Sequence, residues 1–179
     1  MPARIDYSWF HKPLIDYLGN GVDGDVYAIG DDRVVKFSKH AFDATCLLRL
    51  KANTPQQLAT VYDYGLHVAL DLLDTYWVEM ERLNSLTEDE AKVFHSVLSH
   101  EDANKVKEFS ADKLSGMLDG LAFGLEFDKQ KVFDFCAAVQ AAGFIQDDAH
   151  PRNIMRAKDG RFKFVDLDRL RLKSKPTEQ

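Results

Sequence analysis

Cysteine and proline are scarce in this chain, and long apolar runs are absent. Of its 179 residues, 2 are cysteine and 5 are proline. Cys46 and Cys136 lie far apart in apolar, helix-like surroundings, without a CxxC or zinc-ligand spacing. We therefore predict two buried thiols rather than a disulfide or a zinc site. No stretch approaches the length of a membrane span, and residues 1–13 lack the apolar core of a secretory signal. We expect a cytoplasmic protein with no membrane partner.

Positive charge is also in deficit. The chain has 29 acidic and 23 basic residues, which gives a net charge of −6. Contacts to nucleic-acid phosphates need an excess of Lys and Arg, so this balance argues against a general nucleic-acid binder. The exception is the basic stretch 169–175 (RLRLKSK), which is either a solvated terminal strand or a docking strip for acidic substrates or RNA.

The N-terminal part of the chain is rich in strand-forming residues. The runs 26–29 (VYAI) and 33–37 (RVVKF) are β-branched and aromatic, and the Gly-Asp-Asp between them is typical of a turn, which predicts a hairpin. Residues 59–66 and 74–83 have a similar composition and predict two further strands. In this part, residues 41–52 have the periodicity of a helix.

The second part of the chain has helical character. Thr87 and Glu90 have the spacing of a capping box, which predicts a helix over 85–98. Apolar periodicity predicts two more helices, over 110–123 and 128–143.

The order of these elements indicates an α+β fold. A strand is predicted over 161–167, after the last helix. We place the join between a β-rich part and a helical part near residues 83–85, where no flexible linker composition occurs. Two lobes, 1–83 and 84–179, are therefore expected to pack on each other.

A glycine-rich loop opens the first predicted hairpin. Gly19, Gly21 and Gly24 spell G-x-G-x-x-G, with Val26 two residues further on. In a dinucleotide-binding fold this motif leads into a helix, but here two strand-like runs follow it. Glycines in such a hairpin let the backbone approach a ligand and offer N–H groups to phosphate oxygens. A flexible turn without a ligand is the alternative.

Lys36 lies in an otherwise apolar predicted strand. Its neighbours Val35 and Phe37 point to the opposite face, because side chains alternate along a strand. A lysine on a buried face needs an anionic partner, whereas one at a sheet edge can reach solvent. After a phosphate-type loop, Lys36 could also contact ligand phosphates.

Together, GNGVDGDVY at 19–27 and VVKF at 34–37 resemble the glycine loop and strand lysine of the protein-kinase-like fold. The resemblance implies that ATP lies with its phosphates under the loop and against Lys36. The loop residues that this resemblance assigns to ATP are Gly19, Asn20, Gly21, Gly24 and Val26.

The resemblance extends to the next helix and strand. The family pairs its lysine with a helical glutamate, and Asp43 takes that position here. Residues 76–83 (YWVEMERL) resemble the hinge strand, which implies that Met80, Glu81 and Leu83 lie against the adenine.

Residues 145–155 (IQDDAHPRNIM) gather acids, a histidine and an asparagine in one short loop. Taken alone, these side chains could hold a metal, exchange protons or cap a turn. Asp148 and Asn153 have the spacing of the kinase catalytic loop, and Asp166 in FVDLD resembles the family's metal-binding aspartate. The resemblance implies that Asp148 is the catalytic base and that Asn153 and Asp166 bind Mg²⁺.

The chain departs from the common kinase pattern at two positions in this loop and at one position after Asp166. Gln146 replaces the loop histidine, Asp147 stands where many kinases have arginine, and Asp168 replaces a glycine. His150 and Pro151 match the small-molecule phosphotransferase spelling Asp-x-His-Pro-x-Asn, which gives them a role in shaping the turn.

The chain resembles the small serine/threonine kinases of T7-type bacteriophages and is also similar to the aminoglycoside phosphotransferase and lipopolysaccharide kinase families. This resemblance implies a bilobal protein-kinase-like fold with a β-rich N-lobe and a truncated helical C-lobe.

The function implied by the resemblance is an ATP- and Mg²⁺-dependent serine/threonine protein kinase. Its partners would be ATP and a protein substrate, in the cytoplasm of the host if a phage encodes it. A small-molecule kinase and a pseudokinase that binds a partner protein are the alternatives.

Overall fold

The computed structural model describes residues 7–20, 24–68, 74–98, 134–135, 138, 141–142, 144–146, 151–167 and 170–172. Contacts between backbone positions divide the chain into two units. The first unit comprises residues 1–40 and 62–82, and the second comprises 41–61 and 83–179. The expected division at residue 83 assigned residues 41–61 to the N-terminal part, whereas their contacts group them with residues 83–179. The two lobes themselves stay a prediction.

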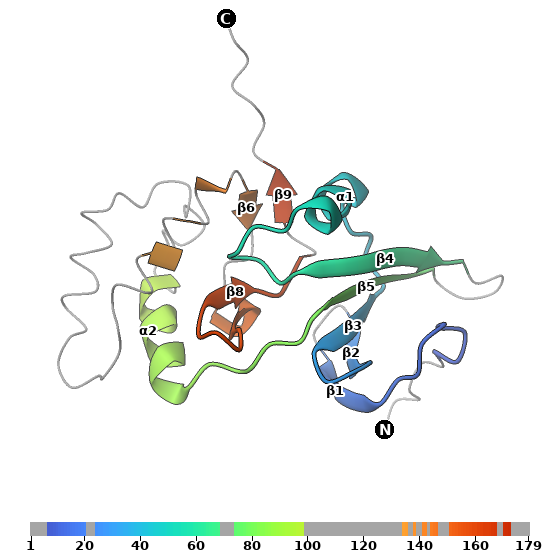
Figure 1. Cartoon of the computed structure of the whole chain (residues 1–179), viewed down its shortest axis with the longest axis horizontal. Coiled ribbons are helices and arrows are strands. Elements are labelled where there is room, and N and C mark those ends of the chain that lie inside the picture. The colour runs from blue at the N-terminus through green and yellow to red at the C-terminus, as the bar shows by residue number, and fades with distance from the viewer. Residues whose placement is uncertain are drawn as a thin grey trace, which may run out of the picture. The chain divides into compact units, whose positions relative to one another are not determined.

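The first unit is built on a five-stranded sheet. Its strands are β1 (Asp16–Asn20), β2 (Gly24–Ala28), β3 (Arg33–Ser38), β4 (Val61–His67) and β5 (Thr75–Glu81). Their order across the sheet is β1-β2-β3-β5-β4, and β4 and β5 run side by side in Figure 1. The pairs β1–β2, β2–β3 and β3–β5 are antiparallel. The predicted hairpin and the two further strands are therefore confirmed.

Alternation along β3 gives this sheet two different faces. Val35 and Phe37 are fully buried and lie opposite Glu79 and Trp77 of β5. Lys36 points to the other face, because consecutive side chains of a strand alternate. The face that bears Phe37 is called the aromatic face below.

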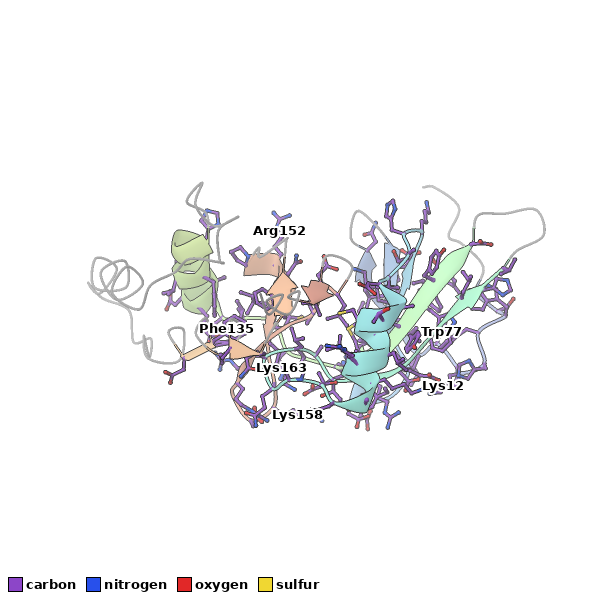
Figure 2. All side chains as sticks on the ribbon, turned by 90° about the horizontal axis from the view of Figure 1, so that it is seen from above. Lys12, Trp77, Phe135, Arg152, Lys158 and Lys163 are labelled. Atoms are coloured by element: carbon purple, nitrogen blue, oxygen red, sulfur yellow. The ribbon has the colours of Figure 1, made fainter. Side chains whose placement is uncertain are left out.

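Residues 7–12 cover the aromatic face, which the sequence had not led us to expect. The ring of Tyr7 stacks on Phe37 at 4.0 Å between centroids, and Phe10 meets the ring of Trp77 edge-on at 5.2 Å. Lys12 closes this segment with an ion pair to Glu79 (Lys12 and Trp77 are labelled in Figure 2). Burying several large rings in this way is a major source of stabilisation for a small sheet.

Two helices of the second unit have well-defined beginnings. Helix α1 (Ala44–Ala52) starts three residues later than expected, because the Asp43 side chain caps its N-terminus. Helix α2 (Glu88–Leu98) begins with the predicted capping box: the amide of Thr87 donates to Glu90 at 2.8 Å, and the amide of Glu90 donates to the Thr87 hydroxyl at 3.3 Å. At the N-terminus of each helix, these side chains therefore accept hydrogen bonds from amide groups that lack a partner within the helix.

The rest of the second unit contains two short antiparallel strand pairs. One joins β6 (Phe144–Gln146) to β9 (Leu170–Leu172). The other joins β7 (Ile154–Arg156) to β8 (Phe162–Phe164) and follows a single 3₁₀ turn, η2 (Pro151–Asn153). The strand predicted over 161–167 is thus shorter than expected.

Several predicted elements lie outside the described residues. They are the helix over 110–123, most of the helix over 128–143, and the basic tail from residue 173. Within the part of the chain that the structure describes, no helix has the length and apolarity needed to cross a membrane.

Candidate functional site

Three of the predicted nucleotide-binding residues share one face of the five-stranded sheet. Val26 pairs directly with Lys36, and Lys36 pairs with Val78 on β5. Met80 lies two residues beyond Val78 and therefore points to the same side. This face lies opposite the aromatic face, so the rings of residues 7–12 do not cover Lys36.

The glycine positions have measurable backbone requirements. Gly19 has a φ of 149°, a conformation that side chains rarely adopt, and the pairing register of β1 shifts between Tyr17 and Gly19. At Gly24 an added Cβ would lie 1.7 Å from the carbonyl oxygen of Phe37, so only glycine fits beside β3. Asn20 pairs with Asp25 across the hairpin, and Gly21 lies outside the described residues.

Asp43 has a local structural role that the sequence analysis did not predict. Its Oδ1 accepts hydrogen bonds from the amides of Thr45 at 2.9 Å and Cys46 at 3.1 Å. This carboxylate acts as the N-cap of α1, a common role for aspartate. The proposed pairing of Asp43 with Lys36 stays a prediction.

The predicted hinge residues span the end of β5. Met80 is buried and pairs with Val34, whereas Glu81 is the last residue of the strand and pairs with Arg33. The amide of Arg82 then donates to the carbonyl of Asp32 at 2.8 Å. Leu83 follows outside any strand, and its predicted contact with adenine is untested.

The two predicted metal ligands meet in the second unit. Asn153 ends the turn η2, and Asp166 follows β8, thirteen residues further along the chain. The amide Nδ2 of Asn153 donates to Oδ2 of Asp166 at 3.4 Å. The amide of Val165 also donates to the carbonyl of Asn153 at 2.9 Å, which ties the two backbone segments together. Amide and carboxylate oxygens are ligands suited to Mg²⁺, which keeps several waters and needs few protein groups.

Both edges of the β7–β8 hairpin are supported by other segments. On the β7 edge, Arg156 and Asn84 exchange two backbone hydrogen bonds of 2.8 Å. On the β8 edge, the amide of Phe164 donates to Gln57 at 2.9 Å, and the amide of Ala59 donates back to Phe164 at 2.8 Å. Asn153 and Asp166 therefore lie at the base of a hairpin held on two sides.

The hairpin packs its aromatic side chains against α2, which lies beside it in Figure 1. The ring of Phe162 meets Phe94 of α2 edge-on at 4.9 Å, and Phe164 lies 5.1 Å from Phe135 (labelled in Figure 2). Arg156 adds an ion pair to the buried Glu90 of the capping box. Among the described residues, the buried Nε of Arg156 has no hydrogen-bond partner.

A buried carboxylate in the first unit was missed by the sequence reasoning. Glu79 has no exposed side-chain surface and accepts hydrogen bonds from Lys12 and, at 2.8 Å, from Arg33. The Arg33 guanidinium also lies 4.0 Å from the centre of the Tyr62 ring. Burial alone would raise the pKa of Glu79, but the two basic partners outweigh burial and leave this pKa below its ordinary value.

The predicted base Asp148 lies outside the described residues, together with Asp147, His150 and Asp168. Gln146 is described and pairs with Leu170 in the β6–β9 ladder. Within the described ranges, no group of three or more His, Cys, Asp or Glu side chains is arranged to hold a metal ion.

Solved structures similar to this chain include three of WbdD, which is described as a bifunctional kinase-methyltransferase. The inhibitor complex of WbdD is 19% identical with a TM-score of 0.43, over 94% of this chain and 35% of that one. A 2.2 Å structure of WbdD is 19% identical with a TM-score of 0.47, over the same shares of the two chains. A third, at medium resolution, is 18% identical with a TM-score of 0.46, over 92% and 36%.

This chain thus spans about a third of the length of those structures. A likeness of this strength does not establish a shared activity. No protein-family profile matches the chain, and no curated protein matches it.

Proposed function

We propose that this chain is a kinase-like phosphotransferase that uses ATP and Mg²⁺. The observation that carries the proposal is the meeting of Asn153 and Asp166, whose side chains lie 3.4 Å apart at the base of one supported hairpin. The resemblance assigns Asn153 and Asp166, thirteen residues apart, as the two metal ligands. Two ligands of one ion must lie close together in space, and these two side chains do. Bound Mg²⁺ would neutralise the phosphate charge that develops during transfer.

The first unit supplies the remaining parts of the proposal. The face of the sheet that bears Val26, Lys36 and Met80 carries a cation beside apolar side chains, groups of the kind that suit phosphates and an adenine ring. Gly24 allows the hairpin to lie close against β3. Asp148 would take or orient the proton of the attacking hydroxyl, so catalysis would depend mainly on positioning and charge.

We propose a serine or threonine hydroxyl of a protein as the acceptor, in agreement with the resemblance to small phage kinases. A small-molecule acceptor is the second candidate, because residues 148–153 read Asp-Ala-His-Pro-Arg-Asn, the spelling of small-molecule phosphotransferases. The two candidates differ only in what receives the phosphate.

The test is phosphate transfer from labelled ATP with Mg²⁺, offered to a cell lysate and separately to aminoglycosides and sugars. Asp166→Asn should lower transfer by about 100-fold or more, as expected when a charge-stabilising group is removed. Asp148→Ala should abolish transfer while ATP binding, measured by calorimetry, persists.

The matched control is Asp159→Asn, the same substitution in the same hairpin. Asp159 is half-exposed and pairs with Arg161 near the turn, so this variant should transfer phosphate at the wild-type rate. Full transfer by Asp166→Asn would refute the metal assignment. ATP binding without transfer to any acceptor would instead favour the pseudokinase.

A further inference from the structure

The segment that covers the aromatic face also contacts the glycine hairpin through one buried hydroxyl. The Tyr7 hydroxyl donates to Oδ2 of Asp25 at 2.8 Å. Asp25 directly follows Gly24 and lies on the same face as Phe37, its partner on β3. The side chain that receives this hydrogen bond therefore belongs to the strand on which the glycine loop ends.

Tyr7 is held firmly enough to act as an anchor. Its side chain is 5% exposed, and its ring stacks on Phe37 at 4.0 Å with an angle of 8° between the planes. Its ring also meets Tyr27 of β2 edge-on at 5.7 Å. Burial, and then the hydrogen bond to Asp25, raise the pKa of Tyr7 well above its ordinary value, so the hydroxyl keeps its proton.

The other strand of the hairpin reaches the same carboxylate. The Tyr17 hydroxyl of β1 lies 3.4 Å from Oδ1 of Asp25, so both oxygens of this carboxylate face tyrosine hydroxyls. The pairing of β1 with β2 is irregular between Tyr17 and Gly19, which leaves the hairpin with fewer regular backbone bonds near its tip. The side-chain hydrogen bonds from Tyr7 and Tyr17 to Asp25 therefore help to hold the hairpin together where backbone pairing is irregular.

We infer that Tyr7 is a positioning residue that holds the glycine hairpin through Asp25 and thereby sets the affinity for the nucleotide. This inference rests on the proposed function for its nucleotide part. Lys12 fixes the other end of the same segment to Glu79, so residues 7–12 are attached to the sheet at both ends. Tyr7 lies on the aromatic face, opposite the face that bears Lys36, and it acts only through Asp25.

The test is Tyr7→Phe, which removes the hydroxyl and keeps the ring on Phe37. Hydrogen exchange of the amides in 16–20 and 24–28 should become faster. The KM for ATP should rise about 10-fold, the factor that about 1.4 kcal/mol represents, while kcat stays unchanged. Tyr62→Phe is the matched control: it removes a hydroxyl from β4 and should change neither quantity.

A double substitution separates positioning from a general loss of stability. In an Asp25→Ala background the acceptor is already gone, so Tyr7→Phe should have no further effect on exchange or on KM. The inference would be overturned if Tyr7→Phe had the same effect in the wild-type and Asp25→Ala backgrounds. It would also be overturned if Tyr7→Phe made exchange faster but left the KM for ATP unchanged. If the wild-type chain binds no nucleotide, the proposed function fails and the nucleotide part of this inference fails with it. If hydrogen exchange is unchanged in Tyr7→Phe while the wild-type chain binds ATP, only the positioning role of Tyr7 is refuted and the proposed function stands.

Discussion

Replacing the buried Glu79 by glutamine tests the electrostatic arrangement on the aromatic face. The carboxylate has no exposed surface and receives hydrogen bonds from two cations, Lys12 and Arg33. Glutamine keeps the shape and one acceptor oxygen, but its NH₂ group would face a cation that needs an acceptor. Since a hydrogen bond to a charged group contributes about 1.5–3 kcal/mol, Glu79→Gln should lower the free energy of unfolding by about 2 kcal/mol.

The pH dependence of this difference gives a second, independent check. The pKa of Glu79 lies below its ordinary value of 4.5 in the folded chain. A depressed carboxyl pKa stabilises the fold above the unfolded-state value, and this stabilisation is lost as the pH falls through the folded-state value. The gap between wild type and Glu79→Gln should therefore be constant from pH 8 to about pH 5 and should shrink below that.

Urea denaturation at several pH values measures both quantities. The control is Glu88→Gln, because Glu88 pairs with Lys92 on the exposed side of α2 and screening by water makes such pairs weak. This control should leave the midpoint of unfolding unchanged at pH 7. A gap that stays constant down to pH 3, or a Glu79→Gln chain as stable as the wild type, would refute the argument from burial and charge.

Two pairs of substitutions and one chemical treatment test other contacts of the described residues. Gly24→Ala should disrupt the β2–β3 pairing and lower the free energy of unfolding by about 1–3 kcal/mol, because the added Cβ would clash with the backbone of Phe37. Gly30→Ala is the control: the nearest atom to its Cβ lies 3.9 Å away, so thermal unfolding should be unchanged. Glu90→Ala should cost about 2–4 kcal/mol and Thr87→Ala about 1 kcal/mol, because only the former also removes the carboxylate partner of the partly buried Arg156; equal losses would contradict this. Burial raises the pKa of Cys46 to about 11, so in a chain whose other cysteine is replaced by serine a thiol reagent at pH 8 should react only after unfolding.

The elements predicted correctly are those with local signals. The turn at residues 30–32 was visible because turn residues separate two β-branched runs, and the structure has β2 and β3 on either side of it. The capping box at Thr87 and Glu90 was visible because its two hydrogen bonds join residues three positions apart. Such patterns are encoded within a few residues, so they can be identified without knowing the fold.

The features that were missed depend on contacts far apart in the sequence. In 75–81 (TYWVEME), Glu79 alternates with apolar neighbours and looks like a solvent-facing residue. It is buried because residues 7–12 lie over it, and Lys12 is 67 positions away. Asp43 was placed within the helix by resemblance to the family's glutamate, yet a short polar side chain before Ala44 is an equally good cap. By contrast, the resemblance had assigned Asn153 and Asp166 to one site. They meet because they flank the β7–β8 hairpin, which brings its two ends together.

The cover of residues 7–12 also imposes an order of events during synthesis. Tyr7 can reach Asp25 after 18 further residues, but Lys12 must wait for Glu79, 67 residues later. At about 5–20 residues per second, the ribosome needs roughly 3 to 13 seconds to make that stretch. For this interval Phe10 lacks Trp77 of β5, one of the rings on which it finally packs. The nascent chain should therefore present an aromatic segment to chaperones until β5 has emerged.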